Sequence, residues 1–380
     1  MVSTIIRNIK NLYHLVTGWF YVIYYGFPAR SLRIIGVTGT DGKTTTSHLI
    51  YEMLKAAGKK VALISTVSDT GFHVTNPDAR QLQKMIREIV DGGFEFLVLE
   101  ITSHGLDQNR LVGIGIEMAV ITNITHEHLD YHKNMANYRQ AKAKILHNTH
   151  YAILNSDDPS FTWLSNQVDR VTKIVPFTKW PDSRRSLALA GDYNRYNIAA
   201  AAAVAEILEI RNWTLEVIRN FSGVPGRMEE IKLGQPFRAI VDFAHTPNAL
   251  EQVLSTLKKS FDSAQDEHRL ILVFGCAGLR DHSKRPLMGK IAVNYADKII
   301  VTAEDPRTEK LDDIYKDIAA VGSLREDDRQ KAINMAVKLA KKGDIVVVTG
   351  KGHEKSICFG TTEYPWSDQE AVKKAIKMLK

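Results

Sequence analysis

Cysteine is scarce in this chain of 380 residues, which contains only Cys276 and Cys358. Two cysteines so far apart offer neither a disulfide framework nor the paired spacing of a zinc site, and they favour a reducing cytoplasm as the compartment. No stretch is apolar over the roughly 20 residues that span a bilayer, and none resembles a cleavable signal peptide. The sequence therefore predicts a cytoplasmic protein without a disulfide or a transmembrane helix.

Concentrated charge is also lacking. The net charge is +7, but the basic residues are scattered and form neither an arginine-rich stripe nor an aromatic RNA-binding pattern. We therefore expect no nucleic-acid partner, and we expect the positive charge to suit small anionic substrates. With 44% hydrophobic and 24% charged residues, the composition is typical of a globular protein of two or three domains.

Residues 1–30 form a distinct N-terminal helical segment, in which apolar and aromatic residues crowd positions 11–27. Its tryptophan and tyrosines lie between cations at both ends, which is typical of a membrane interface. Two interpretations stay open. Residues 5–28 form either a helix that contacts the inner face of a membrane or a helix that packs against the next domain.

A glycine turn separates a β-branched stretch from a helical pattern in the run IIGVTGTDGKTTTSHLIYEML. Gly39 and Gly42 let backbone N–H groups turn toward phosphate oxygens, and Lys43 adds a full positive charge at the start of the helix. Thr44 offers its hydroxyl to Mg²⁺. Because Gly36 lies one residue too far upstream for the GxxxxGK[ST] spacing, the match is to a shorter GxxGKT variant. The run predicts an ATP site, against the alternative of a purely structural glycine turn.

Strand-like and helix-like segments alternate along the rest of the chain, which predicts the α/β class. VALIST, FLVLEIT and MAVITNIT are typical of buried strands and predict a central P-loop ATPase domain, residues 31–222, with a doubly wound, mostly parallel sheet. The run SGVPGRMEEI interrupts the pattern and predicts a hinge. AIVDFAHT, RLILVFGCAG, KIIVTAED and DIVVVTGKG then predict a smaller, Rossmann-like α/β domain over residues 223–380, and SFDSAQDEH predicts a loop within it.

Acidic and histidine side chains follow two of these strands. Glu100 ends one strand opposite the phosphate loop, where a carboxylate can hold Mg²⁺, although a solvated acid is the alternative. The run NITHEHLDYH is rich in histidine, but no CxxC or HExxH pattern supports zinc, so one histidine completing a magnesium site is favoured. Lys142, taken by itself, is predicted to be a solvated helix lysine.

Several motifs in colinear order resemble the Mur ligase family, and within it the members that add the third, diamino, acid to the peptidoglycan precursor. These motifs are GVTGTDGKTTT, EITSHGLDQNR, TNITHEHLDYH, YRQAKAKIL, GDYNRYNIAAA, GVPGRMEEI, VDFAHTPNALE, GCAGLRDHSKRPLMGKIA, EDPRTE and GKGHE. The resemblance covers residues 31–380. Since only residues 1–30 precede it, we expect this chain to lack the family's N-terminal uridine-nucleotide domain.

The resemblance implies an ATP-dependent amide-bond ligase of peptidoglycan synthesis, and hence of cell-wall biogenesis, cell shape and cell division. In such enzymes a carboxylate attacks ATP, and an amine then displaces phosphate from the acyl phosphate. The implied catalytic residues are Lys43, Lys142, His128 and Arg227. The implied ATP-binding residues are Gly39, Thr40, Asp41, Gly42, Lys43, Thr44, Thr45, Asn123, Asn197, Arg227, Asp242 and His245. The implied Mg²⁺ ligands are Thr44, Glu100, His128 and Lys142, the last matching the family's carbamoylated lysine.

The implied substrates are a muramoyl-dipeptide-type acceptor and a diamino acid, with the protein a monomer or weak oligomer. The residues implied to bind the acceptor are Thr75, Asn76, Ser103, Gln108 and Arg110. The residues implied to bind the incoming diamino acid are Arg280, Asp305, Arg307, Gly350 and Glu354. Arg307 resembles the arginine of family members that select meso-diaminopimelate over lysine. An arginine can hold the additional carboxylate of diaminopimelate through two hydrogen bonds.

Some positions depart from the family pattern. Asn76 replaces a threonine, Leu279 replaces a frequent aspartate, and Glu304–Asp305 replace aspartate–asparagine. The added negative charge favours an ammonium group over a carboxylate. Two other functions remain as alternatives: a folylpolyglutamate-type or other Mur-like ligase on a different carboxylate acceptor, and a non-catalytic nucleotide-binding module.

Overall fold

The computed structural model describes residues 2–67, 76–181, 189, 191–261 and 268–379. The chain divides into two compact units. Unit 1 comprises Met1–Thr125, His132–Leu189 and Tyr193–Ser222, and unit 2 comprises His126–Tyr131, Ala190–Asp192 and Gly223–Lys380.

A six-stranded parallel sheet forms the centre of unit 1, in the order β2-β3-β1-β4-β5-β6. Its strands are β1 (Arg33–Thr38), β2 (Val61–Ile64), β3 (Phe96–Glu100), β4 (Met118–Ile121), β5 (Tyr151–Asn155) and β6 (Lys173–Phe177). Strands β3 and β4 are buried along their whole length, because helices cover both faces of the sheet. The strand order reverses at β1, so the crevice typical of doubly wound sheets lies at its carboxyl end.

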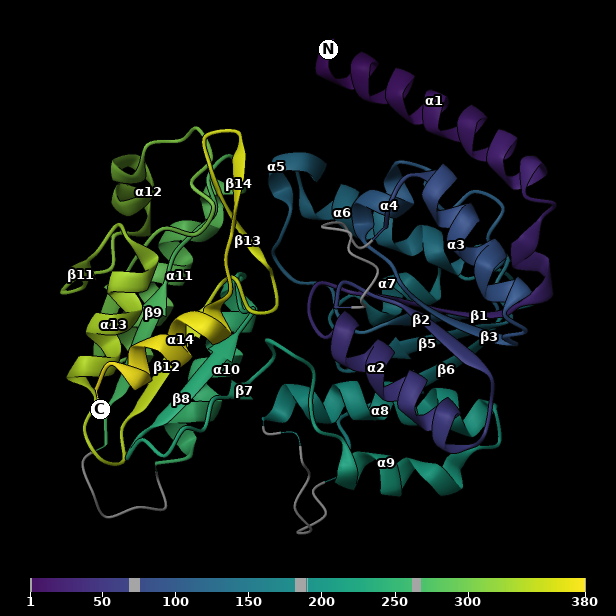
Figure 1. Cartoon of the computed structure of the whole chain (residues 1–380). Coiled ribbons are helices and arrows are strands. Elements are labelled where there is room, and N and C mark those ends of the chain that lie inside the picture. Colours follow the sequence, from purple (N-terminus) through teal and green to yellow (C-terminus); the bar gives the residue numbers. More distant parts are fainter. Residues whose placement is uncertain (1, 68–75, 182–188, 190, 262–267, 380) are drawn as a thin grey trace. The chain divides into compact units, whose positions relative to one another are not determined.

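Helices α2, α8 and α9 cover one face of this sheet, and α3, α4 and α6 cover the other (Figure 1). The helices that lie wholly or mainly in unit 1 are α1 (Val2–Tyr24), α2 (Lys43–Ala56), α3 (Ala79–Asp91), α4 (Ser103–Asp107), α6 (Met135–Ala143), α7 (Phe161–Ser165), α8 (Asp192–Ile207) and α9 (Thr214–Asn220). The short helices η1 (Pro28–Ser31), η2 (Lys144–Leu146) and η3 (Arg211–Trp213) also belong to unit 1, whereas most of the short helix α5 (Leu129–His132) belongs to unit 2.

Unit 2 contains a second six-stranded sheet, in the order β11-β10-β9-β12-β8-β7, in which only β7 is antiparallel to its neighbour. The strands of unit 2 are β7 (Glu229–Glu230), β8 (Arg238–Asp242), β9 (Leu270–Phe274), β10 (Lys298–Val301), β11 (Leu324–Arg325), β12 (Ile345–Thr349) and the hairpin β13 (Ser356–Phe359) and β14 (Thr362–Pro365). Its helices are α10 (Pro247–Lys259), α11 (Arg285–Tyr295), α12 (Leu311–Ile318), α13 (Arg329–Leu339), α14 (Asp368–Lys377) and η4 (His282–Lys284).

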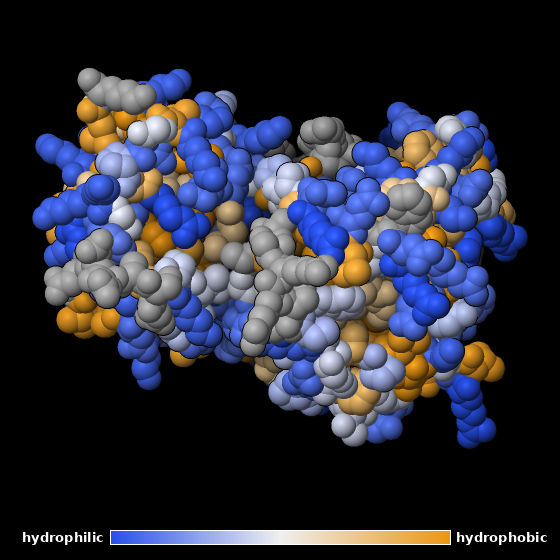
Figure 2. Space-filling view, turned by 90° about the horizontal axis from the view of Figure 1, so that it is seen from below, coloured by the Kyte–Doolittle hydropathy of each residue, from blue (hydrophilic) through white to orange (hydrophobic). Residues whose placement is uncertain are grey.

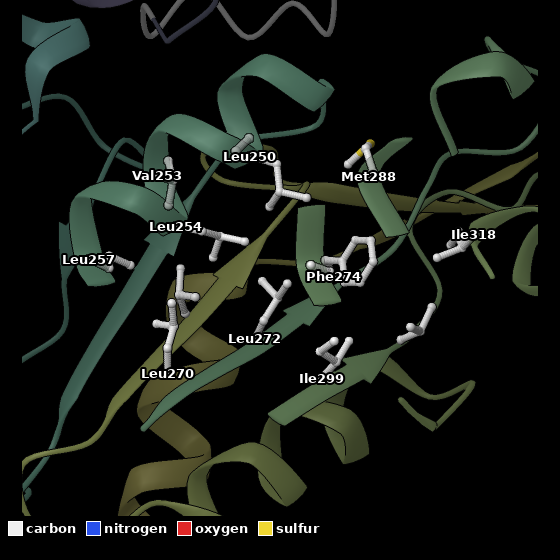
Figure 3. Packing of buried hydrophobic residues seen from close by; sticks show 14 of the residues in the cluster. Leu250, Val253, Leu254, Leu257, Leu270, Leu272, Phe274, Met288, Ile299 and Ile318 are labelled. Carbon is white, nitrogen blue, oxygen red and sulfur yellow. The ribbon is translucent and has the colours of Figure 1, made fainter. Parts of the chain in front are cut away.

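Alternate residues of the central strands of unit 2 point to opposite faces of the sheet. On one face Leu270, Leu272 and Phe274 of β9 pack against α10, α11 and α12, as Figure 3 shows for Leu254, Met288 and their neighbours. On the other face Ile271 and Val273 pack against α13 and α14. Hydrophobic residues on both faces explain why β9 is an uninterrupted apolar run in the sequence.

Helix α1 packs along α3 with one side and leaves the other side exposed (Figure 1). Val22 is fully buried, whereas the exposed side carries large apolar residues whose relative exposure lies between 47% and 70%. These residues are Leu12, Tyr13, Val16, Trp19, Phe20, Ile23 and Tyr24. Within the described part of the chain, no helix combines the length and the apolar character that crossing a bilayer requires.

The predicted fold class is confirmed: both sheets are mostly parallel and carry helices on both faces. The middle of the predicted loop SFDSAQDEH, residues 262–267, lies outside the described residues. Figure 2 shows one side of the molecule, on which hydrophilic residues predominate and hydrophobic ones gather only in separate areas. This distribution is expected where each helix buries one apolar stripe and turns its polar side to solvent.

Candidate active site

The loop between β1 and α2 has a backbone path that needs glycine at two positions. Gly39 and Gly42 have φ angles of 154° and 82°. A Cβ atom on Gly39 would lie 1.8 Å from Thr122 Oγ1, and one on Gly42 would lie 2.2 Å from Asn197 Oδ1. Only glycine allows both this φ range and this close approach, so the loop is shaped by its neighbours as well as by its own sequence.

Polar side chains from the segment after β4 and from α6 hold the same loop. Asn123 Oδ1 accepts a hydrogen bond from Asp41 N at 3.0 Å, and Asn123 Nδ2 donates to Asp41 O at 3.1 Å. The Tyr138 hydroxyl lies 3.0 Å from Thr40 Oγ1. These contacts fix the loop in advance, which is what a phosphate-binding loop requires.

Lys43 begins helix α2, and its ammonium group lies over the loop. Its Nζ donates to Thr40 O at 2.7 Å and to Gly39 O at 3.1 Å. Thr44 and Thr45 are buried in the first turn of the helix. A helix N-terminus, turned backbone amides and a lysine charge are together the features that suit the binding of a phosphate group.

Glu100 at the end of β3 accepts hydrogen bonds from two threonines. Thr44 Oγ1 donates to Glu100 Oε1 at 3.1 Å, Thr66 Oγ1 donates to the same oxygen at 3.0 Å, and Thr66 N donates to Oε2 at 3.0 Å. A hydroxyl and a carboxylate side by side are oxygen ligands that Mg²⁺ prefers. The donor set next to the phosphate loop therefore fits this ion.

Lys142 on α6 is buried, with a relative exposure of 1%, so the expectation of a solvated helix lysine is wrong. Its Nζ donates to Gly39 O at 2.6 Å and lies 4.8 Å from the centre of the Tyr138 ring. Our sequence reasoning missed Tyr138, although its place one helical turn before Lys142 puts both on one face of α6. The pair connects α6 to the phosphate loop.

The predicted acceptor residues gather where α4 follows β3. The Asn76 amide donates to Glu100 O at 2.8 Å and accepts from Thr102 N at 2.8 Å. Arg110 Nη2 donates to Gln108 Oε1 at 2.7 Å, and Arg110 Nη1 donates to Asn76 O at 2.7 Å. Ser103 Oγ lies 3.0 Å from His132 Nε2. Thr75 lies outside the described residues.

His128 belongs to unit 2, with its Nδ1 3.8 Å from Glu127 Oε1, so its role at Mg²⁺ stays a prediction. Among the described residues, His282, Glu309 and Asp317 also lie close enough together to hold a metal ion. However, Arg285 donates to Glu309 Oε1 at 2.6 Å and to Asp317 Oδ2 at 2.9 Å. The guanidinium already supplies the positive charge in that cluster.

The predicted nucleotide-binding residues of unit 2 surround Phe243, which sequence reasoning did not select. The Arg227 guanidinium lies 4.3 Å from the centre of its ring, and the His245 ring centre lies 4.4 Å from it. Asp242 accepts hydrogen bonds from Met228 N and Ala244 N, both at 2.7 Å. Unit 2 thus places an arginine, a histidine and an aromatic ring together at the end of β8.

The residues that we predicted to bind the incoming amino acid form a second group in unit 2. Asp305 Oδ1 accepts from Lys351 Nζ at 2.8 Å and from Cys358 N at 2.9 Å. Arg307 Nη1 donates to Gly278 O at 2.7 Å. Lys351 also pairs with Glu354, whereas Arg280 is exposed.

Glu304 lies behind this group and is almost completely buried. A Cβ atom on Gly350 would lie 2.2 Å from its Oε2. Burial raises the pKa of Glu304 to about 8, against the opposing effect of Arg329, Lys284 and Lys351. At neutral pH this carboxyl is therefore mainly protonated, and it adds little negative charge to the group.

Known proteins resemble the chain over most of its length. The family models described as "Mur ligase middle domain" and "Mur ligase, glutamate ligase domain" match residues 37–179 and 226–352. The UDP-N-acetylmuramoyl-L-alanyl-D-glutamate–2,6-diaminopimelate ligase of Bacillus licheniformis is 36% identical over 419 aligned residues, which cover 99% of this chain and 84% of that protein.

Two solved structures are also similar. A 2,6-diaminopimelate ligase with the same name has a TM-score of 0.58 at 32% identity, covering 92% of this chain and 79% of that one. The Mycobacterium tuberculosis folylpolyglutamate synthase in complex with ADP and AMPPCP has a TM-score of 0.71, covering 88% of this chain and 92% of that one. Because its identity is only 18%, this second likeness concerns the fold alone. The sequence comparisons and the geometry agree that the chain belongs to the Mur ligase family of ATP-dependent amide-bond ligases.

Proposed function

We propose that the protein joins meso-diaminopimelate to the carboxylate of a muramoyl-dipeptide acceptor and converts ATP to ADP and phosphate in the same reaction. The observation that carries the proposal is the phosphate loop with Lys43 above it and the Thr44–Glu100 pair beside it. Three of the residues that we assign to the acceptor, Ser103, Gln108 and Arg110, follow β3 in the chain, and Asn76 donates a hydrogen bond to Glu100 O at the end of β3. The named activity of the Bacillus licheniformis relative supports the choice of substrates.

In the first step the acceptor carboxylate attacks the terminal phosphorus of ATP, forming an acyl phosphate and releasing ADP. Both reactants are anions, so the site must offset their repulsion and hold them in line. Lys43 and the N-terminus of α2 supply fixed positive charge at the phosphate. Mg²⁺, held by Thr44 and Glu100, would neutralise further phosphate charge.

In the second step the amine of the diamino acid attacks the acyl carbon, and phosphate leaves after a tetrahedral intermediate. We assign Lys142 to this site as a carbamate, formed when its neutral amine adds CO₂ and releases a proton. The change turns a buried cation into an anion that can reach a metal ion. Burial of Lys142 beside Gly39 supports the assignment, because a carbamate formed there would lie directly next to the phosphate loop.

The charges around Arg307 support a diamino acid that carries a distal carboxylate. Glu304 and Asp305, which depart from the family pattern, place less negative charge near Arg307 than the sequence suggests. Glu304 is mainly protonated, and Asp305 is paired with Lys351. The Arg307 guanidinium therefore keeps positive charge available for a carboxylate.

Mass spectrometry of the product tests this function. The protein would be incubated with ATP, Mg²⁺ and UDP-N-acetylmuramoyl-L-alanyl-D-glutamate, with meso-diaminopimelate or lysine as the amine. We expect a tripeptide product with diaminopimelate and none from the Lys43→Ala variant. Product formed only from a folate acceptor and glutamate would favour the folylpolyglutamate-type alternative, and no ATP turnover with any acceptor would favour a non-catalytic module.

We also propose that α1 brings the protein to the surface of an anionic bilayer. Its exposed apolar residues recur at helical spacing from Leu12 to Tyr24, while Val22 on the opposite side is buried in unit 1. Lys10 and Arg30, near the two ends of this stripe, are exposed cations. Aromatic residues flanked by cations favour the interface of a membrane with anionic head groups.

Flotation with vesicles tests the membrane proposal. The full chain should float with vesicles that contain phosphatidylglycerol and much less with phosphatidylcholine alone. A Trp19→Ser, Phe20→Ser double variant should stay at the bottom, because both side chains are exposed and can change without unfolding the helix. Val171→Ser, which alters an exposed residue elsewhere, should float like the unaltered protein. If the folded protein does not float, or if the stripe instead pairs two copies in solution, the membrane proposal is wrong.

A further inference from the structure

Two hydrogen bonds of opposite direction tie α1 to the end of α4. Asn11 Nδ2 donates to Asp107 O at 2.9 Å, and Asn109 Nδ2 donates to Asn11 O at 3.3 Å. The first bond uses the side chain of Asn11 and the second uses its backbone. Asn11 therefore fixes the residues on both sides of Gln108.

Gln108 and Arg110 in turn form one rigid pair. Arg110 Nε and Nη2 both donate to Gln108 Oε1, at 3.0 and 2.7 Å, and Arg110 Nη1 is fixed on Asn76 O. These are the residues that the family resemblance assigns to the acceptor. Their position depends on the segment that Asn11 holds.

Close packing of α1 continues beyond this contact. A Cβ atom on Gly113 would lie 2.4 Å from Val22 Cγ2, and one on Gly18 would lie 3.2 Å from Val112 Cβ. Such close approach requires that α1 and residues 112–113 keep one arrangement. The helix is thus a fixed support for the segment after α4.

Three polar atoms near this contact are buried without a hydrogen-bond partner among the described residues: Asn11 Oδ1, His14 Nε2 and Gln83 Oε1. Gln83 belongs to the same contact, because its Nε2 donates to Val112 O at 3.0 Å. Burial, together with the charges of Arg110 and Lys10, lowers the pKa of His14, although Asp78 acts in the other direction. Buried polar atoms without partners are rare, and their presence here marks the contact of α1 with unit 1 as one that packing alone does not explain.

We propose that α1 is part of the acceptor-binding site, with Asn11 as the positioning residue that holds Gln108 and Arg110 toward the muramoyl peptide. This inference rests on the proposed function, since it concerns the acceptor of that reaction. It assigns to α1 a role that the motifs of residues 31–380 do not contain. The role is separate from membrane contact, because Asn11 lies on the packed side of the helix and the apolar stripe lies on the exposed side.

Steady-state kinetics of Asn11→Ala and Asn11→Asp, with Thr17→Ala as the matched control, test the inference. Asn11→Asp keeps the side-chain volume but loses the donor to Asp107 O. Within the described part of the chain, the Thr17 hydroxyl bonds to Tyr13 O and His14 O of α1 itself, so its loss leaves the contact with α4 intact. Thermal unfolding would first verify that each variant is folded.

We expect both Asn11 variants to raise the KM for UDP-N-acetylmuramoyl-L-alanyl-D-glutamate by about 5- to 20-fold, the effect of losing the one side-chain hydrogen bond and leaving its buried acceptor without a partner. The KM for ATP should stay within about twofold, and Thr17→Ala should behave like the unaltered protein. An unchanged KM for the acceptor in folded Asn11→Ala, or an equal rise of both KM values, would overturn the inference. Failure of the proposed function would look different, because the unaltered protein itself would then not use this acceptor.

Discussion

Arg307→Ala is expected to weaken the use of meso-diaminopimelate and to leave the use of ATP unchanged. The guanidinium is held by Gly278 O at 2.7 Å, and its Nη2 lies 3.7 Å from Asp305 Oδ2. The Asp305 carboxylate also accepts hydrogen bonds from Lys351 Nζ and Cys358 N, so it does not fully neutralise the charge of Arg307. The arginine therefore has charge and donors left for a carboxylate of the substrate.

The size of the effect follows from the exposure of the side chain. A hydrogen bond between charged groups contributes about 1.5 to 3 kcal/mol, or roughly 10- to 150-fold in binding. Because 24% of the Arg307 side chain is exposed, water screens part of this interaction. We therefore expect the KM for diaminopimelate to rise about 10- to 30-fold, near the lower end of the range.

The assay would measure ADP release with diaminopimelate or lysine as the varied amine. Arg325→Ala is a matched control, since it removes another arginine of unit 2 that pairs with Asp312 and Asp327. The control should keep the KM of the unaltered protein. An unchanged KM for diaminopimelate in Arg307→Ala, or equal use of lysine and diaminopimelate by the unaltered protein, would refute the reasoning.

Three other perturbations have defined outcomes. Lys43→Ala should lower ATP turnover about 100-fold or more while the melting temperature stays close to that of the unaltered protein, and near-normal turnover would rule out the phosphate-loop assignment. Lys142→Ala should be inactive and partly rescued by a short-chain carboxylate in solution, whereas full activity of Lys142→Arg, which cannot be carbamoylated, would exclude the carbamate. Burial raises the pKa of Glu304 from 4.5 to about 8, so the folded state keeps a proton that the unfolded state loses. Stability should therefore fall as pH rises from about 5 to 8, and Glu304→Gln should flatten this part of the unfolding profile, which denaturant titration at several pH values would measure.

The long parallel strands could be predicted from the sequence because both of their faces are buried. A strand such as β9 is then a run of apolar residues bounded by polar ones. The hairpin strand β14 could not be found in this way, because Thr362–Pro365 is exposed at every position and has no apolar pattern. The two-residue strand β11 is exposed for the same reason.

At the site, the glycines and Lys43 identified the phosphate loop because their spacing is local. The contacts that complete the site join residues far apart in the chain, such as Tyr138 with Thr40 and Lys351 with Asp305. No local pattern encodes such pairs. This is also why the charge of Glu304 and Asp305 looked unfavourable in the sequence: their burial and pairing appear only in the folded chain.

The most direct test of the account follows the oxygen atoms of the acceptor carboxylate. The acceptor UDP-N-acetylmuramoyl-L-alanyl-D-glutamate would carry ¹⁸O in its reacting carboxylate, and the phosphate released in the presence of ATP, Mg²⁺ and meso-diaminopimelate would be analysed by mass spectrometry. Reaction through an acyl phosphate transfers one carboxylate oxygen to phosphate, so we predict one ¹⁸O atom in each phosphate released with the tripeptide product. Phosphate without the label, released while product forms, would contradict the proposed mechanism.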